Sequence, residues 1–136
     1  MKNILITGAS QGIGKATAVE AAKNKMFVGI NYNKNLEAAQ SCIDEVKSAG
    51  GDGMILQCDV ADSNAVKVMF KKFLEKAKTI DGVFNNAGIT GPISQIQDLD
   101  PAELKTLIDT NVSGAFYVAQ ESARAMINQN YGAIVN

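Results

Sequence analysis

The sequence predicts an α/β fold in which a parallel β-sheet carries helices on both faces. Short apolar segments alternate with longer segments of helical composition along the chain, in the order β-α-β-α-β-α-β-α-β. The apolar segments are mostly continuous rather than alternating, which is typical of strands buried on both faces. With 136 residues and no repeat or linker composition, the chain suits a single domain.

Each expected element has its own signal in the sequence. Strands are expected at residues 3–7, 26–32, 53–60 and 131–136, and at 80–88, where the strand runs into a polar loop. Helices are expected at residues 11–25, 36–51, 63–78 and 100–130, from alanine-rich composition or from apolar side chains three and four positions apart. The last one starts with Asp100 as N-cap, Pro101 in the first turn and Glu103 three positions after the cap, and we expect one long helix there.

The composition excludes several classes of function. The net charge is −1 and no basic tract occurs, so neither nucleic acid nor an anionic membrane surface is indicated as a partner. No apolar run approaches the roughly 20 residues that span a bilayer. Histidine is absent, which excludes Ser-His-Asp triads and most zinc chemistry, and no metal site is expected. Cys42 and Cys58 lack a disulfide-framework spacing and are expected to be small buried side chains in a reducing, cytoplasmic compartment.

The segment ITGASQGIG, residues 6–14, lies between the first expected strand and the first expected helix. Its glycines Gly8, Gly12 and Gly14 have the spacing G-x-x-x-G-x-G. Such a loop can be an ordinary tight turn. It can also hold the N–H groups of a helix N-terminus against a pyrophosphate. Its position within a βαβ unit favours the second interpretation, a nucleotide cofactor loop.

The end of the second expected strand favours NADP over NAD as the cofactor. A carboxylate at this position would accept a hydrogen bond from the ribose 2′-OH and would repel a 2′-phosphate. The segment NYNKN has no carboxylate; Asn31, Tyr32 and Asn33 can donate to phosphate oxygens, and Lys34 adds positive charge. The alternative is that these are loop and cap residues, with Asn35 as the N-cap of the next helix.

Three further polar features have two interpretations each. Asp59 follows a strand and can accept a hydrogen bond from an adenine amino group, or it can stabilise a turn. The segment NNAG, residues 85–88, can shape a cofactor cleft or stabilise neighbouring strands. Asn111 lies within the expected long helix with Ser113 and Gly114, and all three weaken a helix. They indicate either close helix packing or a perturbed helix that exposes a backbone group to a site.

Taken together, five motifs resemble the classical short-chain dehydrogenase/reductase family in their order and spacing. They are TGASQGIG, DV, NNAG, DTNVSGAF and GAIVN. Members of this kind include bacterial glucose dehydrogenases and 3-ketoacyl-ACP reductases. The resemblance implies a Rossmann-type, three-layer, doubly wound parallel sheet with strand order 3-2-1-4-5. It also implies a nicotinamide cofactor, either NADP or NAD, and an alcohol or carbonyl compound of low molecular weight as substrate.

The resemblance assigns roles to individual residues. It implies cofactor contacts for Gly8, Ser10, Gln11, Gly12, Ile13 and Gly14 at the pyrophosphate and adenosine ribose, for Tyr32 and Asn33 near the 2′-position, for Asp59 and Val60 at adenine, and for Asn85, Ala87 and Gly88 toward the nicotinamide ribose. Asn111 would be the asparagine of the family's Asn-Ser-Tyr-Lys catalytic tetrad, where it holds a water in the proton relay.

The sequence departs from the family in its proton-transfer residues. The family places a catalytic Ser just after the fifth strand and a Tyr-x-x-x-Lys motif further on. None of Tyr32, Tyr117 and Tyr131 has a lysine four positions later. We therefore expect residues 1–136 to form a single NAD(P)-binding domain that lacks the C-terminal part of the family fold.

The leading functional hypothesis is an NAD(P)-dependent oxidoreductase that interconverts an alcohol and a carbonyl by hydride transfer. This chain would be its cofactor-binding half, inactive by itself because no tyrosine–lysine pair is present. The alternative is a non-catalytic module that binds NADP(H) or a partner. By analogy with the family, a homo-oligomer is expected, either a dimer or a tetramer.

Overall fold

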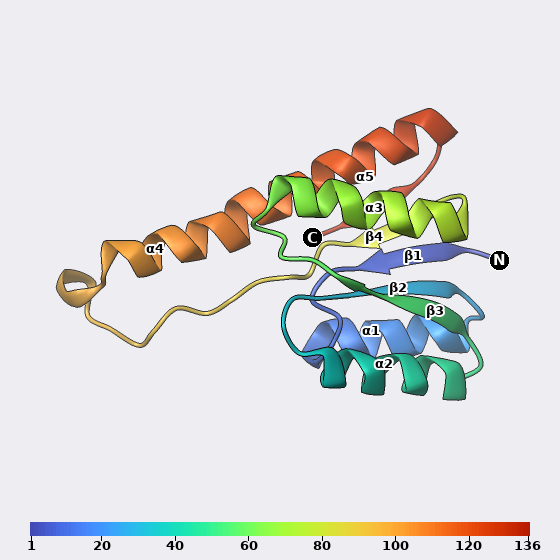
Figure 1. Cartoon of the computed structure of the whole chain (residues 1–136), viewed down its shortest axis with the longest axis horizontal. Helices are drawn as coiled ribbons and strands as arrows, with labels where there is room; N and C mark the ends of the chain where they lie inside the picture. The colour runs from blue at the N-terminus through green and yellow to red at the C-terminus, as the bar shows by residue number, and fades with distance from the viewer.

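The computed structural model describes residues 1–136 and contains one five-stranded sheet (Figure 1). Its strands are β1 (Asn3–Ile6), β2 (Phe27–Tyr32), β3 (Asp52–Gln57), β4 (Gly82–Phe84) and β5 (Ala133–Val135). They lie in the order β3-β2-β1-β4-β5, and every neighbouring pair is parallel. The predicted fold class and strand order are confirmed. Because the winding direction changes between β1 and β4, a crevice is expected at the carboxyl ends of these two strands.

Helices cover both faces of this sheet. One face carries α1 (Gly12–Lys23) and α2 (Leu36–Ser48), and the other carries α3 (Ser63–Ala77) and α5 (Ala115–Gln129) (Figure 1). The predicted caps are present. Asn35 accepts a hydrogen bond from the Ala38 N–H at 2.9 Å at the start of α2. Asp100 accepts one from the Ala102 N–H at 2.8 Å, at the start of α4 (Pro101–Ile108).

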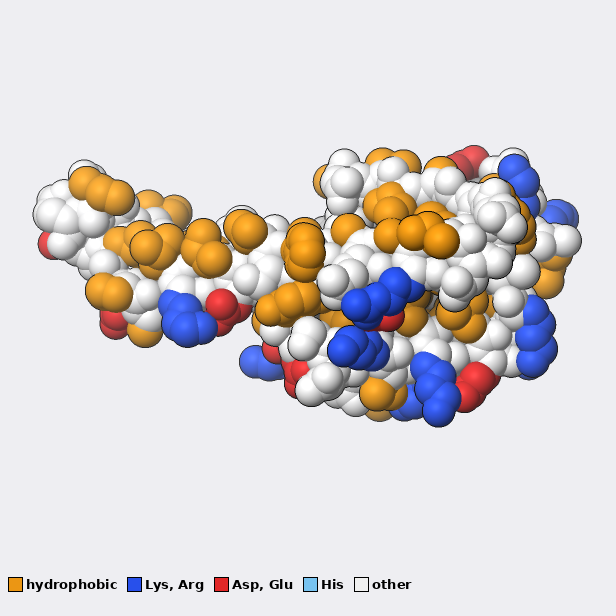
Figure 2. Space-filling view, turned by 90° about the horizontal axis from the view of Figure 1, so that it is seen from above, with side chains coloured by type: hydrophobic (Ala, Val, Ile, Leu, Met, Phe, Trp, Pro, Cys, Tyr) orange, Lys and Arg blue, Asp and Glu red, His pale blue; other side chains and the backbone are white.

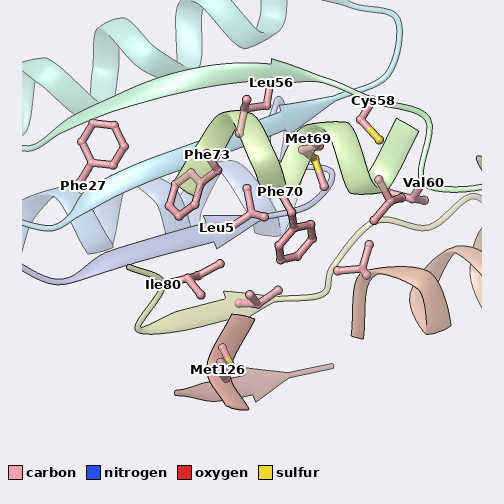
Figure 3. Packing of buried hydrophobic residues seen from close by; sticks show 13 residues of the cluster. Leu5, Phe27, Leu56, Cys58, Val60, Met69, Phe70, Phe73, Ile80 and Met126 are labelled. Carbon is pink, nitrogen blue, oxygen red and sulfur yellow. The ribbon is translucent and has the colours of Figure 1, made fainter. Parts of the chain in front are cut away.

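The core has two layers, one on each side of the sheet. All six residues of β2 are buried, which explains why this strand reads as continuously apolar. Figure 3 shows the layer under α3, where Phe73 packs near Phe27 with ring centroids 6.0 Å apart. Cys58 belongs to this layer and Cys42 to the alanine-rich layer under α1 and α2. Both thiols are free and buried, so the prediction that they are small core side chains is confirmed.

The long helix expected over residues 100–130 is divided, and the interruption contains Asn111 and Gly114, where the sequence offered a perturbed helix as one interpretation. α4 ends at Ile108, a π-helical segment follows at Asp109–Gly114, and only then does α5 begin. The segment contains Asn111 and Gly114, which are poor helix formers, and π-helical turns of this kind interrupt α-helices frequently at functional sites. α4 has no buried residue and projects from the body of the molecule (Figure 1). No helix combines the length and the apolar composition needed to cross a membrane.

All five strands are shorter than expected, and the difference matters most at the carboxyl ends of β3 and β4. β3 ends at Gln57 and β4 at Phe84, so the residues that follow lie in loops at the carboxyl edge of the sheet. We call these loops the β3 turn (Cys58–Val60) and the NNAG loop (Asn85–Gly88). Together with the glycine loop (Gly8–Gly14), they surround the crevice.

Candidate functional site

A cleft of about 530 Å3 opens at the carboxyl edge of the sheet. Most of the predicted cofactor-binding residues line it, namely Gly8, Ser10, Gln11, Gly12, Ile13, Tyr32, Asn33, Asp59, Val60, Ala87 and Gly88. Gly14, Asn85 and Asn111 do not line it. The fold therefore brings together loops that are far apart in the sequence, as expected for a ligand site at the switch point of a doubly wound sheet.

The glycine loop turns in a way that requires glycine at specific positions. Gly8 has φ +62°, and a Cβ there would lie 2.9 Å from the Ala87 Cα. A Cβ at Gly14 would lie 2.6 Å from the Gly8 carbonyl oxygen, so Gly14 allows α1 to pack under the loop and does not itself form the cleft wall. Gln11 provides no side-chain cap for α1, and the first turn has no acidic residue. The N–H groups at this helix start are therefore available to an anion in the cleft.

The NNAG loop is fastened to the end of β1 by a reciprocal set of hydrogen bonds. The Thr7 hydroxyl oxygen accepts from the N–H groups of Asn86 and Ala87, both at 2.9 Å. The Asn86 side chain donates to the carbonyl oxygens of Thr7 and Gly8, at 2.9 and 3.2 Å. Thr7 is fully buried. The relative position of the two loops is thus fixed before any ligand binds.

The two asparagines of the NNAG loop point in different directions. Asn85 donates from its side chain to the Ala115 carbonyl and the Asn136 side chain, both at 2.9 Å, and so ties β4 to α5 and to the end of β5. Asn86 lines the cleft instead. Sequence reasoning selected Asn85 and missed Asn86 and Thr7. The alternation of side chains at a strand end predicts opposite directions for adjacent residues, but not which one faces the cleft.

The residues at the end of β2 have different environments. Asn31 is buried and donates to the carbonyl oxygens of Leu56 and Cys58, so its interpretation as a donor to phosphate is wrong. Tyr32 forms a buried part of the wall, whereas Asn33 and Lys34 lie exposed at the rim. Asn35 is exposed as well, but its side-chain oxygen accepts from the Ala38 N–H, which leaves Asn33 and Lys34 to meet a charged group of a ligand from solvent.

The β3 turn contributes one carboxylate and one inert thiol. One Asp59 oxygen accepts a hydrogen bond from the Ala61 N–H at 2.9 Å, so Asp59 stabilises the turn and also lines the cleft. Burial raises the pKa of the Cys58 thiol to about 12, and the carboxylates of Asp59 and Asp62 act in the same direction. Cys58 is therefore a neutral wall residue at ordinary pH.

Asn111 lies in the π-helical segment and binds the loop opposite. Its side-chain oxygen accepts from the Ile89 N–H at 2.8 Å, and its side-chain nitrogen donates to the Ile89 carbonyl at 2.9 Å. Ile89 and Thr110, the neighbour of Asn111, line the cleft. A Cβ at Gly114 would lie 3.1 Å from the Val60 carbonyl oxygen. The segment thus combines close packing at Gly114 with a perturbed turn beside the cleft.

A parallel α/β sheet with a glycine-turned loop and a polar cleft at its switch point defines a dinucleotide-binding class of domain. Comparison with known families specifies the class further. The family described as short chain dehydrogenase matches residues 2–136, and the chain belongs to this family. The family predicted from the motifs is confirmed.

Individual relatives agree with this assignment. The 3-oxoacyl-[acyl-carrier-protein] reductase of Staphylococcus aureus is 36% identical over 135 residues, which cover 99% of this chain and 54% of that protein. The crystal structure of an NAD+-bound xylitol dehydrogenase has a TM-score of 0.95 at 35% identity and covers 99% of this chain and 52% of its own. A metagenomic short-chain oxidoreductase in complex with NADP has a TM-score of 0.92 at 28% identity, and the match covers 99% of this chain and 60% of that one. The chain spans about half the length of the curated relatives it matches.

Proposed function

We propose that this chain is the cofactor-binding part of an NAD(P)-dependent oxidoreductase that interconverts an alcohol and a carbonyl by hydride transfer. The observation that carries the proposal is the cleft, where the glycine loop, the β3 turn and the NNAG loop meet beside an uncapped helix start. Support comes from the relatives, whose names describe reductases and dehydrogenases and whose structures contain NAD+ or NADP.

The residues present fit a dinucleotide. Nothing lies within 4 Å of the position that a Cβ would take at Gly12, so the space over the helix start is open. In our proposal the glycine loop binds the pyrophosphate and the adenosine ribose through Gly8, Ser10, Gln11, Gly12 and Ile13. The β3 turn binds adenine through Asp59 and Val60. Tyr32 and Asn33 lie near the 2′-position, and Ala87 and Gly88 lie toward the nicotinamide ribose. Gly14 and Asn85 would support these loops from behind the wall.

We propose NADP(H) as the preferred cofactor. Asp59 is the only carboxylate of the cleft lining, and it lies on the β3 turn rather than at the end of β2. Asn33 and Lys34 are exposed at the rim, where an amide and an ammonium group suit a 2′-phosphate. The Asn31 N–H groups already donate to carbonyl oxygens inside the protein. The preference for NADP(H) over NAD(H) would therefore depend on Asn33 and Lys34.

The nicotinamide ring of the bound cofactor would donate or accept the hydride. The residues of this chain would bind and orient the cofactor, since none of them forms a Tyr-x-x-x-Lys pair that could transfer the hydroxyl proton. We propose that Asn111 retains its predicted place at the catalytic end of the cleft. Its side chain is engaged by Ile89, so its contribution would come through the turn that it holds.

The test is a titration of NADPH and NADH, followed by nucleotide fluorescence, with a parallel assay of aldehyde and ketone reduction by the natural protein that carries this sequence. We expect NADPH to bind about tenfold more tightly than NADH, which equals about 1.4 kcal/mol, or one charge-assisted contact. Binding without reduction of any carbonyl would favour the alternative, a non-catalytic NADP(H)-binding module. Absence of binding to both nucleotides would contradict both hypotheses.

We also propose that the protein forms a homo-oligomer through its projecting arm (residues 89–116). Leu104, Ile108, Val112 and Phe116 follow one another at helical spacing and are 47%, 47%, 57% and 61% exposed. Figure 2 shows hydrophobic side chains along this arm. An exposed apolar row of this kind is typical of a surface that another protein surface covers.

A cytoplasmic location is proposed on chemical grounds. Cys42 and Cys58 are both free thiols, and neither takes part in a disulfide. Unpaired cysteines are typical of proteins in reducing compartments.

A further inference from the structure

Asn31 is a buried polar residue at the cleft for which the proposed reaction has no direct use. It is the second-last residue of β2 and is 2% exposed. Its side-chain oxygen accepts a hydrogen bond from the Gly8 N–H at 3.1 Å. Its side-chain nitrogen donates to the carbonyl oxygens of Cys58 at 3.0 Å and Leu56 at 3.2 Å. Every polar group of the amide therefore has a partner inside the protein.

These partners belong to two different loops of the cleft. Gly8 begins the glycine loop, and the Asn31 backbone carbonyl also accepts from the next residue of that loop, Ala9, at 2.8 Å. Cys58 begins the β3 turn. One side chain thus connects the loop proposed to bind the pyrophosphate with the turn proposed to bind adenine.

Only an amide has the groups that this position requires. An aspartate would keep the acceptor for Gly8 but would place a carboxylate oxygen against the two carbonyl oxygens of β3 and its turn. A hydrocarbon side chain would leave the Gly8 N–H without its partner. Gly8 is held at φ +62°, so the direction of its N–H group also fixes the start of the glycine turn.

We propose that Asn31 is a positioning residue of the nucleotide site, and that its amide sets the spacing between the glycine loop and the β3 turn. The inference rests on the proposed function, because this spacing matters only if one ligand spans both loops. A dinucleotide is bound tightly when its two contact regions are already held at the separation that its own covalent structure fixes. Loosening the connection therefore weakens a ligand that spans both loops far more than a fragment that meets only one.

The test compares two probes, ADP-ribose and the free base adenine, by calorimetric or NMR titration of the natural protein carrying this sequence. ADP-ribose spans both loops, whereas adenine lacks the ribose and the pyrophosphate and meets only the β3 turn. For Asn31→Asp and for the smaller, neutral Asn31→Ser, we expect ADP-ribose affinity to fall by at least about tenfold and adenine affinity by less than about threefold.

The chain offers a matched control in Asn3→Asp. Asn3 is also buried on a strand, and its side-chain nitrogen donates to the Ala77 carbonyl at 3.2 Å and the Thr79 hydroxyl at 2.9 Å, far from the cleft. This variant undergoes the same chemical change, so it should lose stability but retain the wild-type ratio of the two affinities.

The possible outcomes separate this inference from the proposed function. If wild-type protein binds ADP-ribose and the Asn31 variants lose both affinities in equal proportion, the positioning role is wrong and the proposed function stands. If both Asn31 variants fail to fold while Asn3→Asp folds, Asn31 is a folding determinant and the positioning role is again wrong. If wild-type protein binds neither ADP-ribose nor NADPH, the proposed function itself fails.

Discussion

The two sides of the cleft are stabilised in different ways. The side formed by the glycine loop, the end of β2 and the β3 turn is held by hydrogen bonds of two buried side chains, Thr7 and Asn31. The other side, the arm, is braced internally by the hydrogen bonds between Asn111 and Ile89. It meets the body in the close contact of Gly114 with Val60, and it exposes apolar side chains. The first side is held in place before any ligand binds, whereas we propose that a second copy covers the arm. Substitutions on the two sides should therefore affect different properties.

The largest effect is expected at Gly14, on the preformed side. In Gly14→Ala the new Cβ would lie 2.6 Å from the Gly8 carbonyl oxygen and 2.9 Å from the Ala9 Cα. Both are backbone atoms, so α1 must move away from the glycine loop. We expect the free energy of unfolding to fall by about 2–3 kcal/mol. We also expect NADPH affinity to fall by more than about tenfold, since the helix start leaves the cleft. Urea denaturation and fluorescence titration measure the two effects.

Gly82→Ala is the matched control for this variant. The nearest atom to a Cβ at Gly82 is 3.7 Å away, at Ile4, so the added methyl group has room. We expect a change in unfolding free energy within about 1 kcal/mol and unchanged nucleotide affinity. Equal losses in the two glycine variants would show that the packing of α1 under the loop is not the cause.

The next effect concerns the connection between β1 and the NNAG loop. Thr7→Val keeps the shape of the side chain but removes the oxygen that accepts from the Asn86 and Ala87 N–H groups. Two partly buried donors lose their partner, and we expect the free energy of unfolding to fall by about 2 kcal/mol. Thr7→Ser retains the oxygen and should recover most of this loss. A valine variant as stable as the serine variant would contradict the role given to this hydrogen-bond pair.

A smaller and more local effect is expected at the base of the arm. Asn111→Ala removes both hydrogen bonds to Ile89, which lie near the surface, so unfolding free energy should fall by no more than about 1 kcal/mol. Hydrogen exchange should speed up at the Ile89 amide and along residues 89–100. Asn128→Ala, at an exposed position of α5, is the control and should leave this exchange unchanged. Unchanged exchange in Asn111→Ala would mean that the loop is held in another way.

The fold was predictable because its signals are local in the sequence. Continuous apolar segments define the strands of a sheet that is buried on both faces, and the cap residues Asn35 and Asp100 define helix starts. The glycine loop could be recognised from its spacing and from its position between a strand and a helix. These features depend on neighbours in the chain, and the structure agrees with the sequence for each of them.

The remaining features depend on contacts between distant segments. The sequence shows two adjacent asparagines at 85 and 86, but only the packed helix α5 and the glycine loop decide which of them faces the cleft. Asn31 is polar and lies at a strand end, so it resembled a ligand donor. Its partners are carbonyl groups of β3 and the following turn, which become neighbours only when the sheet forms. The close packing of Gly114, in the π-helical segment, against Val60 is likewise a contact between segments far apart in the sequence.

The smallest effect on folding, and the sharpest contrast between the two sides, is expected at Phe116. Its side chain is 61% exposed, so Phe116→Ser should change the free energy of unfolding of the isolated chain by less than about 0.5 kcal/mol.

If a second copy covers the arm, the same substitution removes apolar area from that interface and shifts the protein toward monomer in sedimentation or light scattering. Val68→Ser removes a similarly exposed apolar side chain, 50% exposed, from α3 outside the arm, and should leave the mass unchanged. Equal masses for wild type and both variants would mean that the arm does not mediate self-association. A shift in Phe116→Ser alone would locate the interface on the arm, because the two substitutions expose similar chemistry at different places.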